Sequence, residues 1–114
     1  MKLNPTQIHN LKNLITFYEE IPDEKWCQGT YENFMGQKCA LGHAGVQSSS
    51  TDIKNLPIAL NLIDIMQTYL KTENSNENFN VVLLEIASTN DNGKGKPKNN
   101  IVNFLRGILE KQNL

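Results

Sequence analysis

Apolar residues recur at helical spacing in four stretches of the chain, separated by polar segments rich in asparagine or glycine. Near the amino terminus they lie three and four residues apart, which places them on one face of a helix. Asn4 is predicted to cap this helix, with Pro5 in its first position and Gln7 completing a capping box. Ile21 precedes Pro22, so the helix is expected to end near this point. The predicted inner face comprises Ile8, Leu11, Leu14, Ile15 and Tyr18.

The other three stretches predict further long helices. One follows Asn55, its predicted cap, and carries Pro57 in its first turn. A second covers residues 79–87, although the apolar run 81–84 alone would also suit a buried strand. The last is expected to start near Asn99 or Asn100 and to bury Phe104 and its helical neighbours. The pattern therefore predicts a mainly α protein: one small domain, residues 1–114, of four to five helices.

Residues 22–46 follow a less regular pattern. Gly29, Gly36 and the polar residues between them read as a loop in which Tyr31, Phe34 and Met35 are expected to act as apolar anchors. Cys39 to Val46 predicts a short helix of small residues. Two glycines within one turn weaken a helix by about 1 kcal/mol each relative to alanine. We therefore expect Gly42 and its neighbours to be needed for a close approach of backbone to backbone.

Composition and charge exclude several classes of protein. The chain has 114 residues, of which 39% are hydrophobic and 20% charged, and its net charge is -1. Binding to nucleic acid or to an anionic membrane needs a positive field, so neither partner is expected. No apolar run approaches the roughly 18 residues of a membrane helix, and the amino terminus lacks the apolar core of a signal peptide. Two cysteines without such a signal suggest reduced thiols in the cytoplasm.

Cys39, His43 and Asp91 are the candidate catalytic residues. Cys39 and His43 are four residues apart and would share one face of a helix. A helix N-terminus and a nearby imidazolium would both lower the pKa of the thiol, giving a nucleophile with its base. Asp91 could orient the imidazole as the third member of a triad. The alternative is that Cys39 is a packed core residue, that a backbone carbonyl satisfies His43, and that Asn90 and Asp91 cap a helix.

Four more residues are candidates for binding: Trp26, Gly29, Gly42 and Asn90. Trp26 could stack on a flat ligand or a cation, and its alternative role is the largest anchor of a small core. Cys27, Cys39, His43 and His9 include the right ligand types for zinc, but their spacing matches no compact metal motif. No phosphate-loop, dinucleotide or hydrolase motif occurs. We therefore expect no metal and no cofactor.

The segments just described resemble a family of small uncharacterised proteins of bacteria and their phages. The resemblance rests on Trp26-x-x-Gly29, on Cys39-Ala40-Leu41-Gly42 and on Asn90-Asp91, and it spans roughly Ile8 to Leu109. It implies an α-helical domain. The family more often has alanine where this chain has His43, which weakens the case for His43 as an essential base.

Two functions follow as hypotheses. The first is a small binding protein, a phage or mobile-element accessory protein that engages a host protein or a small ligand. It requires an exposed apolar or mixed patch and predicts that Cys39→Ser leaves function intact. The second is a thiol-dependent hydrolase or transferase that uses Cys39, His43 and Asp91. It requires an accessible Cys39 within hydrogen-bond reach of His43.

Overall fold

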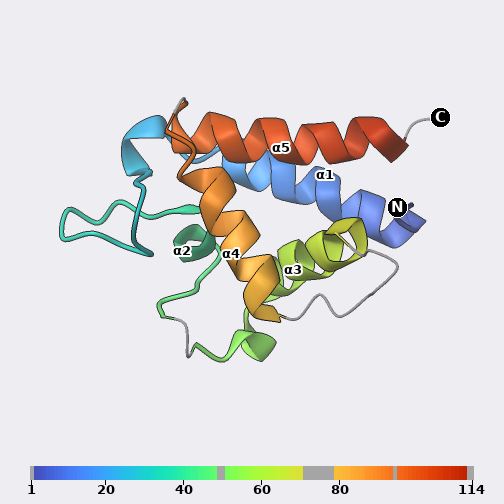
Figure 1. The fold of residues 1–114 in the computed structure, drawn as a ribbon, viewed down its shortest axis with the longest axis horizontal. Helices are drawn as coiled ribbons and strands as arrows, with labels where there is room; N and C mark the ends of the chain where they lie inside the picture. The colour runs from blue at the N-terminus through green and yellow to red at the C-terminus, as the bar shows by residue number, and fades with distance from the viewer. Residues whose placement is uncertain (1, 49–50, 71–78, 94, 113–114) are drawn as a thin grey trace.

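The computed structural model describes residues 2–48, 51–70, 79–93 and 95–112. Within these ranges the chain forms five α-helices and no strand, which confirms the predicted mainly α fold. Figure 1 shows the helices in chain order. They are α1 (Pro5–Glu19), α2 (Ala40–His43), α3 (Pro57–Leu70), α4 (Phe79–Asn90) and α5 (Pro97–Gln112), with 3-10 turns η1 (Asp23–Lys25) and η2 (Ile53–Asn55).

The first helix begins as its sequence predicts. The Asn4 side chain accepts a hydrogen bond from the Gln7 backbone N–H at 2.7 Å, and the Gln7 side chain accepts one from the Asn4 N–H at 3.0 Å. These reciprocal bonds form a capping box. Gln7 also donates to Asp64 and Thr68 of α3, so the cap ties the first turn of α1 to its neighbour.

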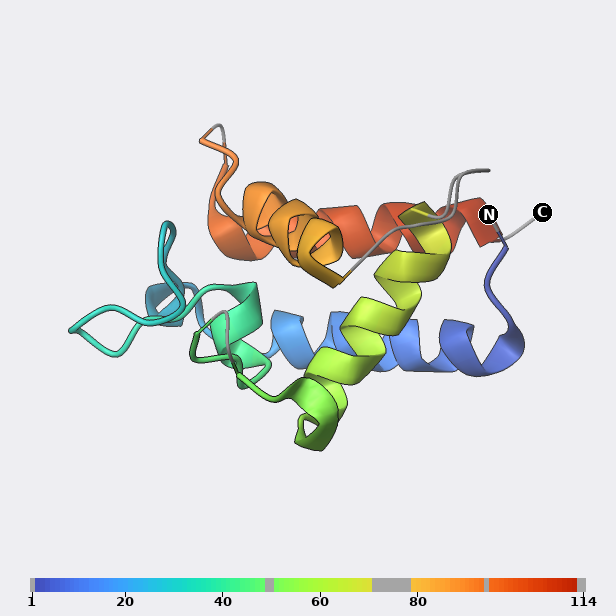
Figure 2. The ribbon, with the colours of Figure 1, turned by 60° about the horizontal axis from the view of Figure 1, so that its bottom comes forward.

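The long helices pack around one apolar core. The helices α1 and α5 lie side by side, although they are at opposite ends of the sequence (Figure 1). The helix α3 packs on α1, and α4 contacts both α3 and α5. The view in Figure 2 shows α3 running obliquely across α1. The single-turn α2 packs against α4. None of the described helices is long and apolar enough to span a bilayer.

Two predicted helix starts were wrong. The last helix begins at Pro97 rather than at Asn99 or Asn100, because proline suits the first helical position. Asn100 instead lies inside α5 and donates from its side chain to the Asn92 carbonyl at 3.0 Å. Asn55 belongs to η2 rather than capping α3, and Asp52 accepts from the Lys54 N–H at the start of that turn.

The apolar residues of the 28–38 loop do not behave alike. Tyr31 is half-buried against the core, as expected. Phe34 is 99% exposed and Met35 71% exposed, so the prediction that they anchor the loop was wrong. They lie on a turn that the Asn33 side chain builds, accepting from the backbone N–H groups of Met35 and Gln37. Hydrogen bonds of a polar turn, rather than apolar burial, therefore fix the tip of this loop.

Candidate functional site

The helix α2 packs closely against the backbone of the 28–38 loop. A Cβ atom on Gly42 would lie 2.0 Å from the Tyr31 carbonyl oxygen and 3.1 Å from the Lys38 Cβ. The same Tyr31 carbonyl accepts from the Cys39 N–H at 3.3 Å. This confirms the close approach that the glycines of this segment predicted. Gly42, one of the predicted binding residues, thus acts by letting Tyr31 and Cys39 lie together.

Asn90, another predicted binding residue, is buried at the end of α4 and joins three segments. Its side-chain oxygen accepts from the Ala40 N–H, the first residue of α2, at 3.0 Å. Its side-chain nitrogen donates to the Cys27 carbonyl at 3.0 Å and to Asp91 at 2.8 Å. With an exposed fraction of 0%, Asn90 cannot touch a ligand in this arrangement. It holds α2 and the loop in place.

Asp91 follows α4 directly and faces Gly29 of the loop. Its Oδ1 atom accepts from the Gly29 N–H at 3.1 Å as well as from Asn90. Gly29 has a φ of 83°, a left-handed conformation that glycine adopts without strain. This bond brings the Trp-x-x-Gly and Asn-Asp segments together in space.

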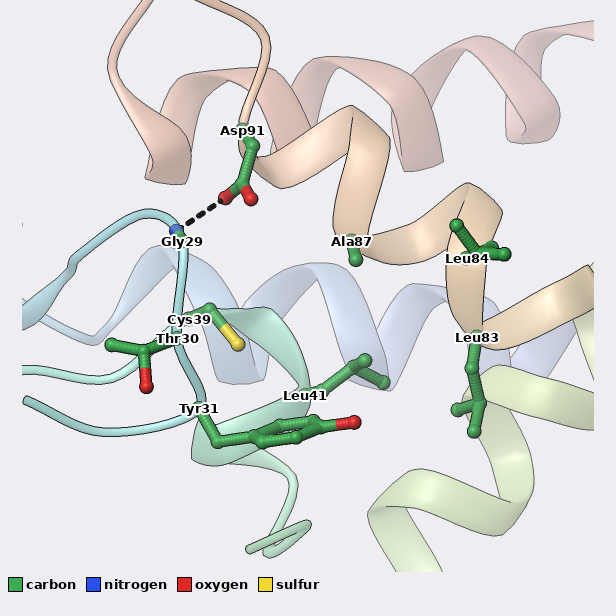
Figure 3. Close-up of a pocket in the computed structure, with 9 residues that line it drawn as sticks. All are labelled: Gly29, Thr30, Tyr31, Cys39, Leu41, Leu83, Leu84, Ala87 and Asp91. Carbon is green, nitrogen blue, oxygen red and sulfur yellow. Dashed lines mark hydrogen bonds between the residues drawn. The ribbon is translucent and has the colours of Figure 1, made fainter. Parts of the chain in front are cut away.

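A pocket of about 380 Å³ opens between the loop, α2 and α4. Figure 3 shows the Asp91 carboxylate at one side, the Tyr31 ring at another and the Cys39 sulfur pointing into the space between them. Apolar side chains of α2 and α4 form the remaining wall. The residues that line the pocket are Gly29, Thr30, Tyr31, Cys39, Leu41, Leu83, Leu84, Ala87 and Asp91.

The environment of Cys39 changes its acidity in the direction opposite to the prediction. Burial raises the pKa of the Cys39 thiol, and the negative charge of Asp91 adds to this effect. The backbone N–H groups of Gly42 and Leu41 oppose it but do not reverse it. The helix α2 is only one turn long, so it supplies little of the dipole on which the prediction of a lowered pKa relied. The thiol is therefore the dominant form at neutral pH.

His43 does not join Cys39 and Asp91 in the pocket. Its ring packs against Trp26, with the ring centroids 4.7 Å apart, and it is not among the residues that line the pocket. Its Nε2 atom is buried without a hydrogen-bond partner among the described residues. Burial lowers the pKa of His43, and the positive charge of Lys38 acts in the same direction, whereas the backbone of Lys25 and of Lys38 opposes this lowering without reversing it. The structure thus brings two of the three candidate catalytic residues together and leaves the base elsewhere.

Trp26 lies in the core and away from the pocket. It is 4% exposed, and its indole N–H donates to the Ile21 carbonyl at 3.3 Å. Its ring also packs on Tyr18, with centroids 5.5 Å apart. Tyr18 in turn donates its hydroxyl to the Ala40 carbonyl at 2.8 Å. The alternative role of Trp26, as the anchor of a small core, is the one that its position supports.

The four residues considered as zinc ligands are not assembled. Among the residues that the structure describes, no group of three or more His, Cys, Asp or Glu side chains is arranged to hold a metal ion. His9 is exposed on α1, where its ring pairs with Asn13. Cys27 and Cys39 are both free thiols.

The apolar wall of the pocket was not predicted. The spacing placed Leu83 on the inner face of its helix, where it is buried, but it gave no role in a pocket to Leu84, which is 67% exposed. A helix of this length can bury only one face, so consecutive apolar residues in α4 must include some that face solvent. The run of four consecutive apolar residues is therefore the sequence signal from which an exposed Leu84 could have been predicted. No comparable signal marks Tyr31, because its position in the pocket depends on the fold of the loop.

Comparisons with known proteins do not identify the chain. No protein-family model matches it, and neither the search of curated proteins nor that of solved structures gives a match. The resemblance to small bacterial and phage proteins therefore stays a prediction that rests on the motifs around Trp26, Cys39 and Asn90. The functional argument depends on the pocket.

Proposed function

We propose that this chain is a small cytoplasmic binding protein, without catalytic activity, whose ligand site is the pocket between Tyr31, Cys39 and α4. The observation that carries the proposal is the composition of that pocket. Its walls are mostly apolar, and a fixed carboxylate and a thiol face the same space. Small-ligand sites have this character: an apolar cavity in which a few polar groups set the orientation of the ligand.

The same pocket argues against the thiol-enzyme hypothesis. A nucleophilic cysteine needs a thiolate and a base within hydrogen-bond reach. Cys39 has a raised pKa, no hydrogen bond joins its thiol to His43 among the described residues, and Asp91 repels a thiolate rather than stabilising it. The thiol of Cys39 and the imidazole of His43 are thus separated, whereas the apolar walls and the carboxylate that suit a binding site lie in one pocket.

Alkylation of the two cysteines against pH distinguishes the two functions. Iodoacetamide labelling of the folded protein, read by mass spectrometry, gives separate rates for Cys39 and for the half-buried Cys27. We expect Cys39 to react slowly at neutral pH and to accelerate only in the alkaline range, because burial disfavours its thiolate. Rapid labelling of Cys39 below neutral pH would overturn the proposal and favour the enzyme. Cys27 in the same sample controls for reagent and folding.

A protein partner is a second candidate, favoured by the exposed loop tip, Phe34 and Met35. The Asn33 side chain holds this turn with bonds of 3.0 Å to two backbone N–H groups, and Gly36 completes it with a φ of 80°. A large aromatic side chain held in water on an ordered turn can enter a partner pocket with little loss of conformational entropy. This tip also meets the requirement of the binding hypothesis for exposed apolar surface.

The loop tip can be tested by changing its side chains without touching the turn. The double variant Phe34→Ser, Met35→Ser keeps Asn33 and Gly36, so its melting temperature is expected to match that of the wild type. The control is Leu60→Ser, which removes an exposed apolar side chain from α3. A partner protein should be captured from lysate by the wild type and by this control, but not by the double variant. Equal capture by all three would remove the tip from the interface.

A further inference from the structure

We propose that the pocket takes a small organic cation: a protonated amine carried on an apolar body. This inference rests on the proposed function of the pocket as a ligand site and adds the chemical class of the ligand. It follows from three features of the pocket: its charge, its hydrogen bonds and its walls.

Among the described residues that line the pocket, the side chains carry an unbalanced negative charge. Asp91 is the one carboxylate among them, and no lysine, arginine or histidine is among them. The field of Asp91 reaches the thiol of Cys39, whose ionisation it disfavours. A cation entering the pocket would meet an attractive potential, whereas an anion would be repelled.

Within the part of the chain that the structure describes, the hydrogen bonds of Asp91 leave its charge without a basic partner. Its Oδ1 atom accepts from two neutral donors, the Gly29 N–H at 3.1 Å and the Asn90 amide at 2.8 Å. These bonds fix the carboxylate, and within the described part of the chain Oδ2 receives no hydrogen bond. A carboxylate oriented by neutral donors on one oxygen can offer the other to an ammonium N–H in a charge-assisted hydrogen bond.

The walls opposite Asp91 suit an apolar body. The Tyr31 ring and the side chains of Leu41, Leu83 and Ala87 line this part of the pocket, and Leu84 extends it to the surface. A volume of about 380 Å³ lies at the lower end of the range of small-ligand sites. The site therefore favours a ligand of the size of a phenylalkylamine, with its nitrogen at Asp91 and its ring beside Tyr31.

Three probes of matched shape test the inference: phenethylammonium, the neutral 2-phenylethanol and the anionic 3-phenylpropanoate. Each is titrated into ¹⁵N-labelled protein, and the amide signals of Gly29 and Ala87 report on the pocket while that of Gly107 in α5 reports on the rest of the fold. We expect phenethylammonium to bind about tenfold more tightly than the alcohol, and the carboxylate to bind most weakly.

The variant Asp91→Asn isolates the charge. Asparagine keeps an Oδ1 acceptor for the Gly29 N–H, so the loop should stay in place while the preference for the cation is lost. Asp23→Asn removes an equal charge from η1, outside the pocket, and should bind all three probes as the wild type does. Added salt should weaken cation binding to the wild type and leave that to Asp91→Asn unchanged.

The outcomes separate this inference from the proposed function. Equal affinity for the ammonium and the alcohol, or an unchanged preference in Asp91→Asn, would overturn the cation inference and leave the pocket as a ligand site. Pocket signals that none of the three probes shifts, at the solubility limit of each, would overturn both. Shifts that include Gly107 and the pocket equally would mean non-specific binding and would also count against both.

Discussion

At the scale of single residues, Gly42 decides whether the pocket can form. The space beside it is filled by the Tyr31 carbonyl, which a Cβ atom would approach to 2.0 Å. Backbone cannot rotate away as a flexible side chain can, so any larger residue must separate α2 from the loop. The hydrogen bond from the Cys39 N–H to the same carbonyl would be lost with it.

We therefore expect Gly42→Ala to lower the free energy of unfolding by about 2 to 3 kcal/mol. Urea denaturation measures this change, and faster alkylation of Cys39 would show that the loop has moved. Gly107→Ala is the matched control, because nothing lies within 4 Å of its added Cβ and the residue is inside α5. Alanine there should stabilise the protein by about 0.5 to 1 kcal/mol. Equal effects at the two positions would refute the steric argument.

Also at the scale of single residues, the protonation of His43 makes the stability of the protein depend on pH. Burial lowers its pKa below the ordinary value of about 6.5, so the unfolded chain binds the proton more readily than the folded one. The stability associated with neutral His43 is complete above that value and is lost as pH falls below it.

His43→Phe should remove this loss. Phenylalanine keeps a ring beside Trp26 and eliminates the buried Nε2 atom, which has no hydrogen-bond partner among the residues that the structure describes. We expect the variant to lose less stability than the wild type between pH 8 and pH 5, measured by urea unfolding at each pH. His9→Gln, which changes an exposed histidine and leaves His43 intact, is the control. If His43→Phe lost as much stability as the wild type between pH 8 and pH 5, groups other than His43 would be responsible for the loss of stability in acid.

At the scale of elements, the C-terminal end of α4 organises the region around the pocket. Asn90 bonds to the first residue of α2 and to the loop at Cys27, while Asp91 bonds to Gly29. Gln28 adds a bond to the Asn90 carbonyl at 3.2 Å. Two consecutive residues at the end of one helix therefore help to hold both a single-turn helix and a long loop around the pocket.

Asn90→Ala should test this joint. It leaves the buried Ala40 N–H and the Cys27 carbonyl without their partner, and we expect a loss of about 2 to 3 kcal/mol in the free energy of unfolding. Thermal and urea unfolding measure the loss. Asn103→Ala, on the exposed face of α5, makes the same chemical change and should stay within about 0.5 kcal/mol of the wild type. A loss no larger than that of the control would mean that α2 and the loop are held by other contacts.

The elements also show what the sequence could predict. Helical spacing and the capping residues Asn4, Pro5 and Gln7 located α1, because those signals are local. The glycines near Gly42 predicted a close approach but not its partner. The Tyr31 carbonyl lies eleven residues away in a loop without periodicity, and only the fold brings it there. Likewise, His43 follows Cys39 at helical spacing, but α2 ends after a single turn. The ring of His43 packs on Trp26 rather than facing the thiol of Cys39.

At the scale of the whole molecule, packing between the first and last helices joins the two ends of the chain. The helices α1 and α5 lie side by side, and the radius of gyration of 13.5 Å is that of a compact chain of this length. Near the termini, the Gln112 side chain accepts from the buried Leu3 N–H at 2.7 Å and donates to the Ile108 carbonyl at 3.2 Å. Towards the other end, Arg106 of α5 forms an ion pair with Glu19 of α1 on the surface.

These two ties, one from α5 to the segment before α1 and one from α5 to α1, should differ in strength and in their response to salt. Arg106→Ala breaks a pair whose side chains are 51% and 38% exposed, and it should cost at most about 1 kcal/mol, less as salt is added. Gln112→Ala leaves the buried Leu3 N–H unsatisfied and should cost about 1 to 3 kcal/mol at any ionic strength. Urea unfolding of both variants at low and at high sodium chloride measures the contrast. If Arg106→Ala proved the more damaging at high salt, the closure of the fold would depend on surface charge rather than on the buried amide of Gln112.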